Sequence, residues 1–201
     1  MRGDDATTGP SPAELETGPF PAELETERLV LRTTAPCYAE AAFAEFTDEI
    51  TLYLRAATPT CVDETRDYYS GAEQRIREGA DYEVNIFRKG DSEFLGGGGL
   101  IRANTATPEL GIWIKKSAHR CGYAKEALSA LVAWAEANLT YEYILYPAVD
   151  VNWPSRRTAE SLGGVYTRNY MDADLAGDPM SLVEYRIPAR PDPNACDGGS
   201  Q

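Results

Sequence analysis

Short segments with the apolar pattern of β-strands recur along the chain. They predict seven strands, at residues 28–32, 82–88, 94–101, 109–114, 143–149, 165–170 and 182–187. The second and third are separated by Lys89, Gly90 and Asp91, which predicts a tight hairpin turn. The third strand contains four consecutive glycines, from Gly96 to Gly99. Together these segments predict one sheet.

The intervening segments follow the helical period. Helices are predicted at 39–46, at 63–78 and at 123–138, and a short one starts near Pro154 and stops at Gly163. The helix at 123–138 has the clearest apolar face: Ala124, Leu128, Leu131, Val132 and Ala135. The helix at 63–78 rests on a four-residue spacing: Tyr68, Ala72 and Ile76. The order β-α-α-β-β-β-α-β-α-β-β predicts a mixed α/β fold.

The two ends of the chain have a different composition. Residues 1–24 are rich in Pro, Gly, Thr and acidic side chains, and residues 188–201 hold three prolines and two adjacent glycines. Both ends are predicted to be disordered, which leaves one domain at 25–187. The motif PAELET occurs at 12–17 and again at 21–26, and we interpret it as a local duplication because two short copies cannot form a solenoid.

Composition narrows the possible partners. The net charge is −13, which argues against a nucleic-acid surface, since that surface requires clustered Lys and Arg. Four scattered cysteines and one histidine argue against a metal site. The N-terminus lacks the features of a signal peptide, and no apolar run approaches the length of a membrane span. We therefore expect a cytoplasmic protein without a metal, nucleic-acid or membrane partner.

The segment from Glu109 to Ala130 carries the strongest chemical signal. A strand ends at Ile114, a polar loop follows, and Gly122 opens the clearest helix. The free N–H groups of a first helical turn form an anion site, and a glycine lets an anionic group approach the backbone. Taken alone, Gly122 fits an ordinary helix start equally well.

Four segments in register resemble the GNAT superfamily of N-acetyltransferases. The resemblance is to the branch that contains ribosomal-protein N-terminal and small-amine acetyltransferases, and it covers about residues 25–187. It rests on ETERLVLR at 25–32, ELGIWI at 109–114, GYAKEAL at 122–128, and Asn152-x-x-Ser155 with Ser161-Leu162-Gly163.

The resemblance implies a twisted, mostly antiparallel sheet of about seven strands, with helices on both faces and a splayed cofactor cleft. It implies acetyl-CoA as co-substrate, with the pantetheine along the strand at 109–114 and the pyrophosphate on the turn at 119–124. The cofactor-binding residues implied are Ile112, Trp113, Ile114, His119, Arg120, Cys121, Gly122, Tyr123, Ala124, Asn152 and Ser155.

The turn departs from the family pattern. His119 stands where Arg or Gln is usual, and Arg120 stands where glycine is frequent. If residue 120 needs a positive φ, arginine costs roughly 1 kcal/mol there, which a contact of its guanidinium with phosphate would offset. Cys121 is an alternative nucleophile, although transfer in this family is usually direct. His119 is an alternative general base, although its position favours the phosphate side.

Two residues are candidates for catalysis. Glu109 is expected to remove the amine proton through water, the alternative being a solvated charge at a strand end. Ser155 is expected to donate to the leaving thiolate, the alternative being a helix cap. Many family members carry a tyrosine four residues after this serine, but here that residue is Ala159.

The acceptor prediction rests on charge. Residues 1–24 carry −4 and residues 188–201 carry −1 of the total of −13, so 25–187 carry −8. An acidic field attracts cations, and Asp172, Asp174 and Asp178 fall in a loop that borders the acceptor opening in relatives. We therefore expect a small cationic primary amine as acceptor. The alternatives are a protein N-terminus and a non-catalytic acyl-CoA-binding module, and a homodimer is a further possible partner.

Aromatic residues on the first helices are candidates for the wall of the acceptor pocket, although core packing explains most of them. They are Phe43, Phe46, Tyr53, Tyr68 and Tyr69.

Overall fold

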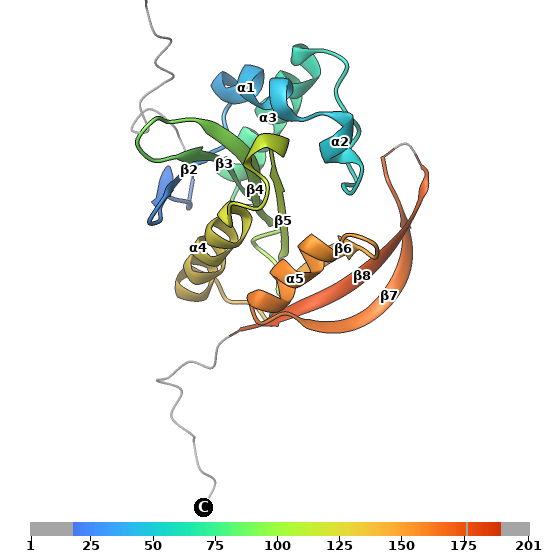
Figure 1. The fold of residues 1–201 in the computed structure, drawn as a ribbon. Coiled ribbons are helices and arrows are strands. Elements are labelled where there is room, and N and C mark those ends of the chain that lie inside the picture. Colours follow the sequence, from blue (N-terminus) through green and yellow to red (C-terminus); the bar gives the residue numbers. More distant parts are fainter. Residues whose placement is uncertain (1–17, 176, 190–201) are drawn as a thin grey trace, which may run out of the picture.

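The structure is a computed structural model that describes residues 18–175 and 177–189. Its strands form one sheet in the order β1-β2-β3-β4-β5-β6-β8-β7 (Figure 1). They are β1 (Glu23–Glu25), β2 (Leu29–Thr33), β3 (Tyr82–Arg88), β4 (Phe94–Ile101), β5 (Glu109–Ile114), β6 (Tyr143–Val149), β7 (Val165–Ala173) and β8 (Pro179–Pro188). Neighbouring strands are antiparallel, except that β5 and β6 are parallel. The predicted mixed α/β class is confirmed, with eight strands in place of about seven.

Five α-helices connect and cover these strands. They are α1 (Ala39–Glu45), α2 (Asp48–Thr51), α3 (Val62–Arg77), α4 (Tyr123–Asn138) and α5 (Trp153–Ser161), with 3-10 turns at Pro36–Tyr38 and Lys116–Ala118. The sequence did not predict α2, because a single helical turn is too short to show an apolar period. The helix predicted at 123–138 and the strands predicted at 82–88, 94–101, 109–114 and 143–149 have the expected bounds.

Two helical layers cover opposite faces of the sheet (Figure 1). On one face, Leu128 of α4 and Ala159 of α5 join the larger hydrophobic core. On the other, Ala42 of α1 and Tyr69 of α3 form a smaller core against the sheet. Tyr68, which the four-residue spacing placed on the buried face of α3, is instead 54% exposed. The 3.6-residue turn brings the neighbouring Tyr69 onto that face.

The described chain begins with an ordered segment. Phe20 is only 5% exposed and its ring stacks on Tyr82 at 4.8 Å. The second PAELET copy forms β1, which pairs with β2. The expectation of disorder is therefore wrong for residues 18–24, because one buried aromatic ring and a strand edge compensate for a polar composition. Residues 1–17, with the first PAELET copy, and residues 190–201 lie outside the described residues.

The C-terminal hairpin is longer than its apolar pattern predicted. β7 and β8 pair from Val165 opposite Arg186 to Ala173 opposite Pro179. Backbone pairing continues past the periodic positions because strand hydrogen bonds do not depend on side-chain polarity. The long hairpin curves away from α5 (Figure 1).

The parallel neighbours β5 and β6 create the central feature of the fold. They share one Cα pair, Glu109 with Leu145, and then separate. α4 follows β5 and α5 follows β6, so both helices start at the end of the sheet where the gap opens. This is the geometry of the predicted cofactor cleft.

Candidate active site

The loop between β5 and α4 has a strained backbone. Arg120 and Gly122 both have positive φ, at 63° and 80°. Position 120 therefore does require the conformation that disfavours arginine by roughly 1 kcal/mol. Gly122 is the N-cap of α4, and no side chain caps this helix by a hydrogen bond. The first N–H groups of α4 are thus available to an anion.

Two side chains hold this loop in place. His119 Nε2 lies 2.7 Å from the carbonyl oxygen of Ile114, and Arg28 Nη1 donates to the carbonyl of Cys121 at 3.0 Å. Arg28 is itself fixed by an ion pair with Glu126 at 2.7 Å. The contact of His119 with the backbone of β5 favours a structural role over general-base catalysis.

The edge of β5 that borders the gap presents backbone groups to it. The N–H of Lys115 donates to the carbonyl of Leu95 in β4 at 2.8 Å. Because successive residues of a strand point their backbone groups to opposite edges, those of Ile112 and Ile114 face the gap, where the Ile114 carbonyl oxygen already contacts His119 Nε2. The indole of Trp113 lies elsewhere, since it packs against Phe46 at 4.8 Å on the α1 side of the sheet.

The start of α5 lies on the other side of the gap. Asn152 caps this helix, with its Oδ1 accepting from the N–H of Ser155 at 3.3 Å. The cap is therefore Asn152, and the alternative reading of Ser155 as the helix cap is wrong. The Ser155 hydroxyl instead lies 3.0 Å from the hydroxyl of Tyr146 on β6.

Glu109 projects from the opposite face of the sheet. Its carboxylate forms an ion pair with Arg55 and a second one with Arg102 at 3.2 Å. The Glu109 side chain is 16% exposed. A carboxylate offers about four acceptor positions, so acceptor positions remain for a water or an amine. Arg55 also pairs with Asp172 of β7 at 3.3 Å, which ties the α2–α3 connection to the C-terminal hairpin.

A pocket of about 360 Å³ adjoins this ion-pair cluster through Met180, which pairs with Asp172 across the hairpin. It is lined by Leu52, Tyr53, Val149, Asp150, Val151, Pro179, Met180 and Ser181. Its walls thus come from the end of α2, the end of β6 and the start of β8. Tyr53 is the one aromatic candidate that lines it, whereas Phe46 packs on Trp113 and Tyr69 lies in the smaller core.

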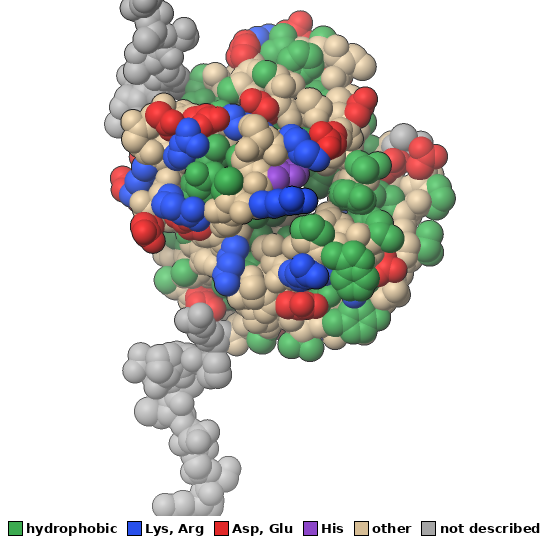
Figure 2. Space-filling view, viewed as in Figure 1, with side chains coloured by type: hydrophobic (Ala, Val, Ile, Leu, Met, Phe, Trp, Pro, Cys, Tyr) green, Lys and Arg blue, Asp and Glu red, His purple; other side chains and the backbone are tan. Residues whose placement is uncertain are grey.

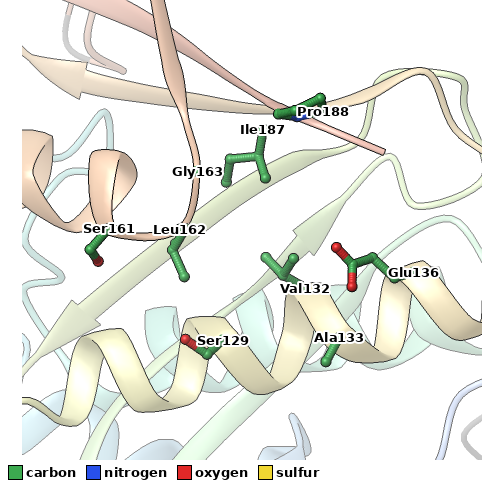
Figure 3. Close-up of a pocket in the computed structure, with 9 residues that line it drawn as sticks. All are labelled: Ser129, Val132, Ala133, Glu136, Ser161, Leu162, Gly163, Ile187 and Pro188. Atoms are coloured by element: carbon green, nitrogen blue, oxygen red, sulfur yellow. The ribbon is translucent and has the colours of Figure 1, made fainter. Parts of the chain in front are cut away.

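A second pocket, of about 390 Å³, lies between the C-terminal halves of α4 and α5 (Figure 3). It is lined by Ser129, Val132, Ala133, Glu136, Ser161, Leu162, Gly163, Ile187 and Pro188. None of the predicted site residues lines it. It lies at the opposite ends of the two helices from the uncapped turn and from Ser155.

Positive charge gathers near the starts of α4 and α5 (Figure 2). Arg120, Lys125 and Arg157 are exposed, and no ion pair of theirs is found among the described residues. Arg156, also at the start of α5, is used internally, because its Nη1 donates to Asp150 at 2.8 Å. It therefore adds no free charge to this electropositive region.

A model of the acetyltransferase (GNAT) domain family matches residues 28–165. The chain belongs to the GNAT acetyltransferase family. It is an acyltransferase of the kind that uses acetyl-CoA. No curated protein matches this chain.

Solved GNAT structures share the fold at low sequence identity. One is a GNAT-family acetyltransferase from Bacillus anthracis, 19% identical, with a TM-score of 0.71 over 83% of this chain and 98% of that one. Another, from Salmonella typhimurium, modifies the N-terminal serine of ribosomal protein L7/L12; it is 18% identical, with a TM-score of 0.72 over 82% and 97%. A third is the microcin C7 self-immunity acetyltransferase MccE in complex with acetyl-CoA and AMP, 15% identical, with a TM-score of 0.72 over 84% and 97%.

The residues of this GNAT domain fit acetyl-CoA. The uncapped start of α4 and the free cations suit its phosphates, and the open edge of β5 suits an amide-bearing arm. Among the described residues, no cluster of His, Cys, Asp or Glu is arranged to hold a metal ion. In the same part of the chain, no helix is long and apolar enough to span a membrane.

Sequence reasoning missed three residues at this site. Arg55 and Leu52 lie in a connection without periodicity, so no local signal marked them. Tyr146 was interpreted only as part of a buried strand. The only available hint was that Tyr146 and Ser155 stand on either side of the β6–α5 turn. Whether their hydroxyls meet depends on how α5 packs on β6, which the sequence does not show.

Proposed function

We propose that this enzyme transfers the acetyl group of acetyl-CoA directly to a primary amine of a small cationic molecule. The gap between β5 and β6 carries the proposal. Ser155 lies on its α5 side, and Glu109 lies on the opposite face of the sheet. A donor for the leaving group and an acceptor for the amine proton are thus separated by the opening through which the two substrates would meet.

Each protein group has a task in this proposal. Bound acetyl-CoA supplies a thioester, whose carbonyl carbon takes up the amine nitrogen as the C–S bond breaks. The backbone N–H groups that face the gap at Ile112 and Ile114 stabilise negative charge on the thioester oxygen. Glu109 accepts the amine proton through water, and Ser155 donates a hydrogen bond to the departing sulfur. The N–H groups at 120–124 bind the pyrophosphate.

The acceptor pocket supports an amine with an apolar body. Leu52, Tyr53 and Met180 provide apolar walls. Asp172 pairs with Met180 across the hairpin, and Arg55 links Asp172 to Glu109, so these two carboxylates belong to the cluster next to the pocket lining. Arg55 partly neutralises both carboxylates, so the attraction for a cation is a property of the whole acidic surface as well as of these two groups.

The free thiols of Cys37, Cys61 and Cys121 support the reducing cytoplasm as the compartment.

A protein N-terminus is the second candidate acceptor. The observation in its favour is the exposed apolar surface near the mouth of the pocket, where Leu52 is 63% and Val151 is 65% exposed. Apolar patches of this kind commonly mark contacts with other macromolecules. A peptide acceptor would use these side chains, whereas a small amine would need only the pocket.

Thiol release from acetyl-CoA tests the proposal against a panel of amines, aminoglycosides, nucleosides, amino acids and peptides. We expect the highest kcat/KM for a small cation, and we expect it to fall with added salt because screening weakens long-range attraction. A peptide as best acceptor supports the second candidate. An anionic best acceptor, or no salt dependence, overturns the electrostatic argument. Binding of acetyl-CoA without turnover of any amine would identify a non-catalytic module.

A further inference from the structure

Tyr146 is a buried hydroxyl that the mechanism above does not use. It lies on β6 with 3% of its surface exposed, in the core beneath α5. Its hydroxyl lies 3.0 Å from that of Ser155. Ser155 is itself half-buried, at the first turn of α5 beside the gap. A buried hydroxyl thus sits behind the residue proposed to contact the leaving sulfur.

The direction of this hydrogen bond follows from burial. Burial raises the pKa of Tyr146, so the phenol keeps its proton at neutral pH. Among the described residues, Ser155 is the one partner found for this phenol. If Ser155 donated to Tyr146, the phenolic proton would be left without an acceptor, at a cost of about 1–3 kcal/mol. Tyr146 therefore donates to Ser155, and the hydrogen of Ser155 is free to point elsewhere.

We propose that Tyr146 is a positioning residue, which fixes the Ser155 hydroxyl so that its hydrogen points into the gap toward the sulfur of acetyl-CoA. This inference rests on the function proposed above for Ser155. Residue 159, one turn further along α5, is an alanine and carries no hydroxyl. The second hydroxyl beside Ser155 therefore comes from Tyr146 on the strand below the helix.

No proton moves between Tyr146 and Ser155 in this arrangement. The new C–N bond forms as the C–S bond breaks, and the amine proton leaves on the Glu109 side. The sulfur departs as a thiolate that accepts a hydrogen bond from Ser155 and takes its proton from solvent after release. Donation from Tyr146 also polarises the Ser155 hydroxyl, which strengthens its own donation because hydrogen bonds in a chain reinforce one another.

Binding of free coenzyme A tests this without knowledge of the acceptor. Calorimetry compares coenzyme A with desulfo-coenzyme A, which lacks the thiol, across pH 6 to about 9, a range that spans the ordinary thiol pKa of about 8.5. If the Ser155 hydroxyl donates to the thiolate, the affinity for coenzyme A relative to that for desulfo-coenzyme A increases with pH, because more of the thiol is ionised. In the wild-type enzyme we expect this preference to rise about tenfold, the effect of one charge-assisted hydrogen bond.

The variants separate the two roles. Ser155→Ala should abolish the pH-dependent preference, and Tyr146→Phe should reduce it to about threefold or less, with the affinity for desulfo-coenzyme A unchanged in both. In turnover, both should lower kcat with little change in KM, and the double variant should be no worse than Ser155→Ala. Tyr143→Phe is the matched control, because it removes a hydroxyl from the opposite face of the same strand.

Two results would decide against the inference. A wild-type pH curve in Ser155→Ala removes the proposed role of Ser155 and the inference with it. A wild-type curve in Tyr146→Phe, while Ser155→Ala loses the preference, removes the inference alone and leaves the proposed function standing. Tyr146→Met is a second variant without the hydroxyl. If thermal unfolding shows that Tyr146→Phe is not folded, the pH dependence of the coenzyme A preference is measured in Tyr146→Met instead, with the same two interpretations.

Discussion

The cofactor side and the acceptor side of this enzyme are built in different ways. On the proposed cofactor side, the loop at 115–122 and the first turn of α4 are contiguous in sequence, and backbone N–H groups are the groups proposed to bind. On the proposed acceptor side, Leu52 and Arg55, Glu109, and Met180 come from three distant segments, and side chains form the pocket and the ion pairs. The comparison teaches that a site made of backbone leaves a local signature, whereas a site made of scattered side chains leaves none.

The two sides also differ in how their charges are arranged. Near the cofactor turn, Arg120 and Lys125 are exposed and Arg28 is fixed by Glu126. On the acceptor side, Arg55 joins two carboxylates, Glu109 and Asp172. Free cations suit an anionic ligand, while the paired cluster joins the α2–α3 connection to β5 and β7. Changes on one side should therefore leave the function of the other intact, which the following variants test.

Glu109→Gln should have the largest effect. The amide keeps an acceptor for Arg55 but cannot take up a proton, so kcat should fall on the order of 10²-fold. The affinity for acetyl-CoA, measured by calorimetry, should not change.

Glu142→Gln is the matched control for this charge change, because Glu142 is exposed and immediately precedes β6. It should retain wild-type kcat. Undiminished kcat in Glu109→Gln would show that Glu109 only anchors Arg55, and the general base would then have to be sought elsewhere.

Gly122→Val should act on the cofactor side alone. A side chain at φ 80° is strained, and the added carbons block the approach of the pyrophosphate to the backbone. The affinity for acetyl-CoA should fall at least about tenfold, or 1.4 kcal/mol.

Gly163→Val controls for strain, since Gly163 has φ 85° with open space around the position of its missing Cβ. It should lower the melting temperature without weakening acetyl-CoA binding. If calorimetry finds unchanged affinity in folded Gly122→Val, the pyrophosphate does not bind at this turn.

Glu126→Gln should have the smallest effect, on stability rather than on chemistry. Burial alone would raise the pKa of Glu126, but hydrogen bonds from Thr26 and Arg28 outweigh it and hold the pKa below its ordinary value. A lowered folded-state pKa stabilises the fold above the unfolded pKa of about 4.3, and this contribution is lost as pH falls through the folded value. At pH 7 the variant should lose about 1 kcal/mol.

The difference in free energy of unfolding between wild type and Glu126→Gln should shrink below about pH 4. Chemical denaturation at a series of pH values measures this difference. Glu27→Gln, which changes an exposed carboxylate next to Arg28 in the sequence, should match wild type throughout. A stability difference that is independent of pH would mean that packing, and not the charge of Glu126, links β2 to α4.

The sequence by itself determined the central elements and marked the turn that is proposed to bind the cofactor. The strands at 82–88, 94–101, 109–114 and 143–149 and the helix at 123–138 could be predicted because apolar period and turn residues are local properties. The turn at 119–124 could be found because residues 122–128 resemble the family motif, whereas the glycine before the helix, taken alone, fits an ordinary helix start equally well. The requirement for a positive φ at Arg120 was likewise foreseeable from the motif.

Tertiary structure alone decided the rest. Phe20 is ordered because Tyr82, far along the chain, offers a ring to stack on. Arg55 reaches Glu109 only because the sheet brings α2 and β5 together, and Tyr146 meets Ser155 only because α5 folds back over β6. Such contacts depend on the summed geometry of strand twist and helix packing, and no window of sequence contains that geometry.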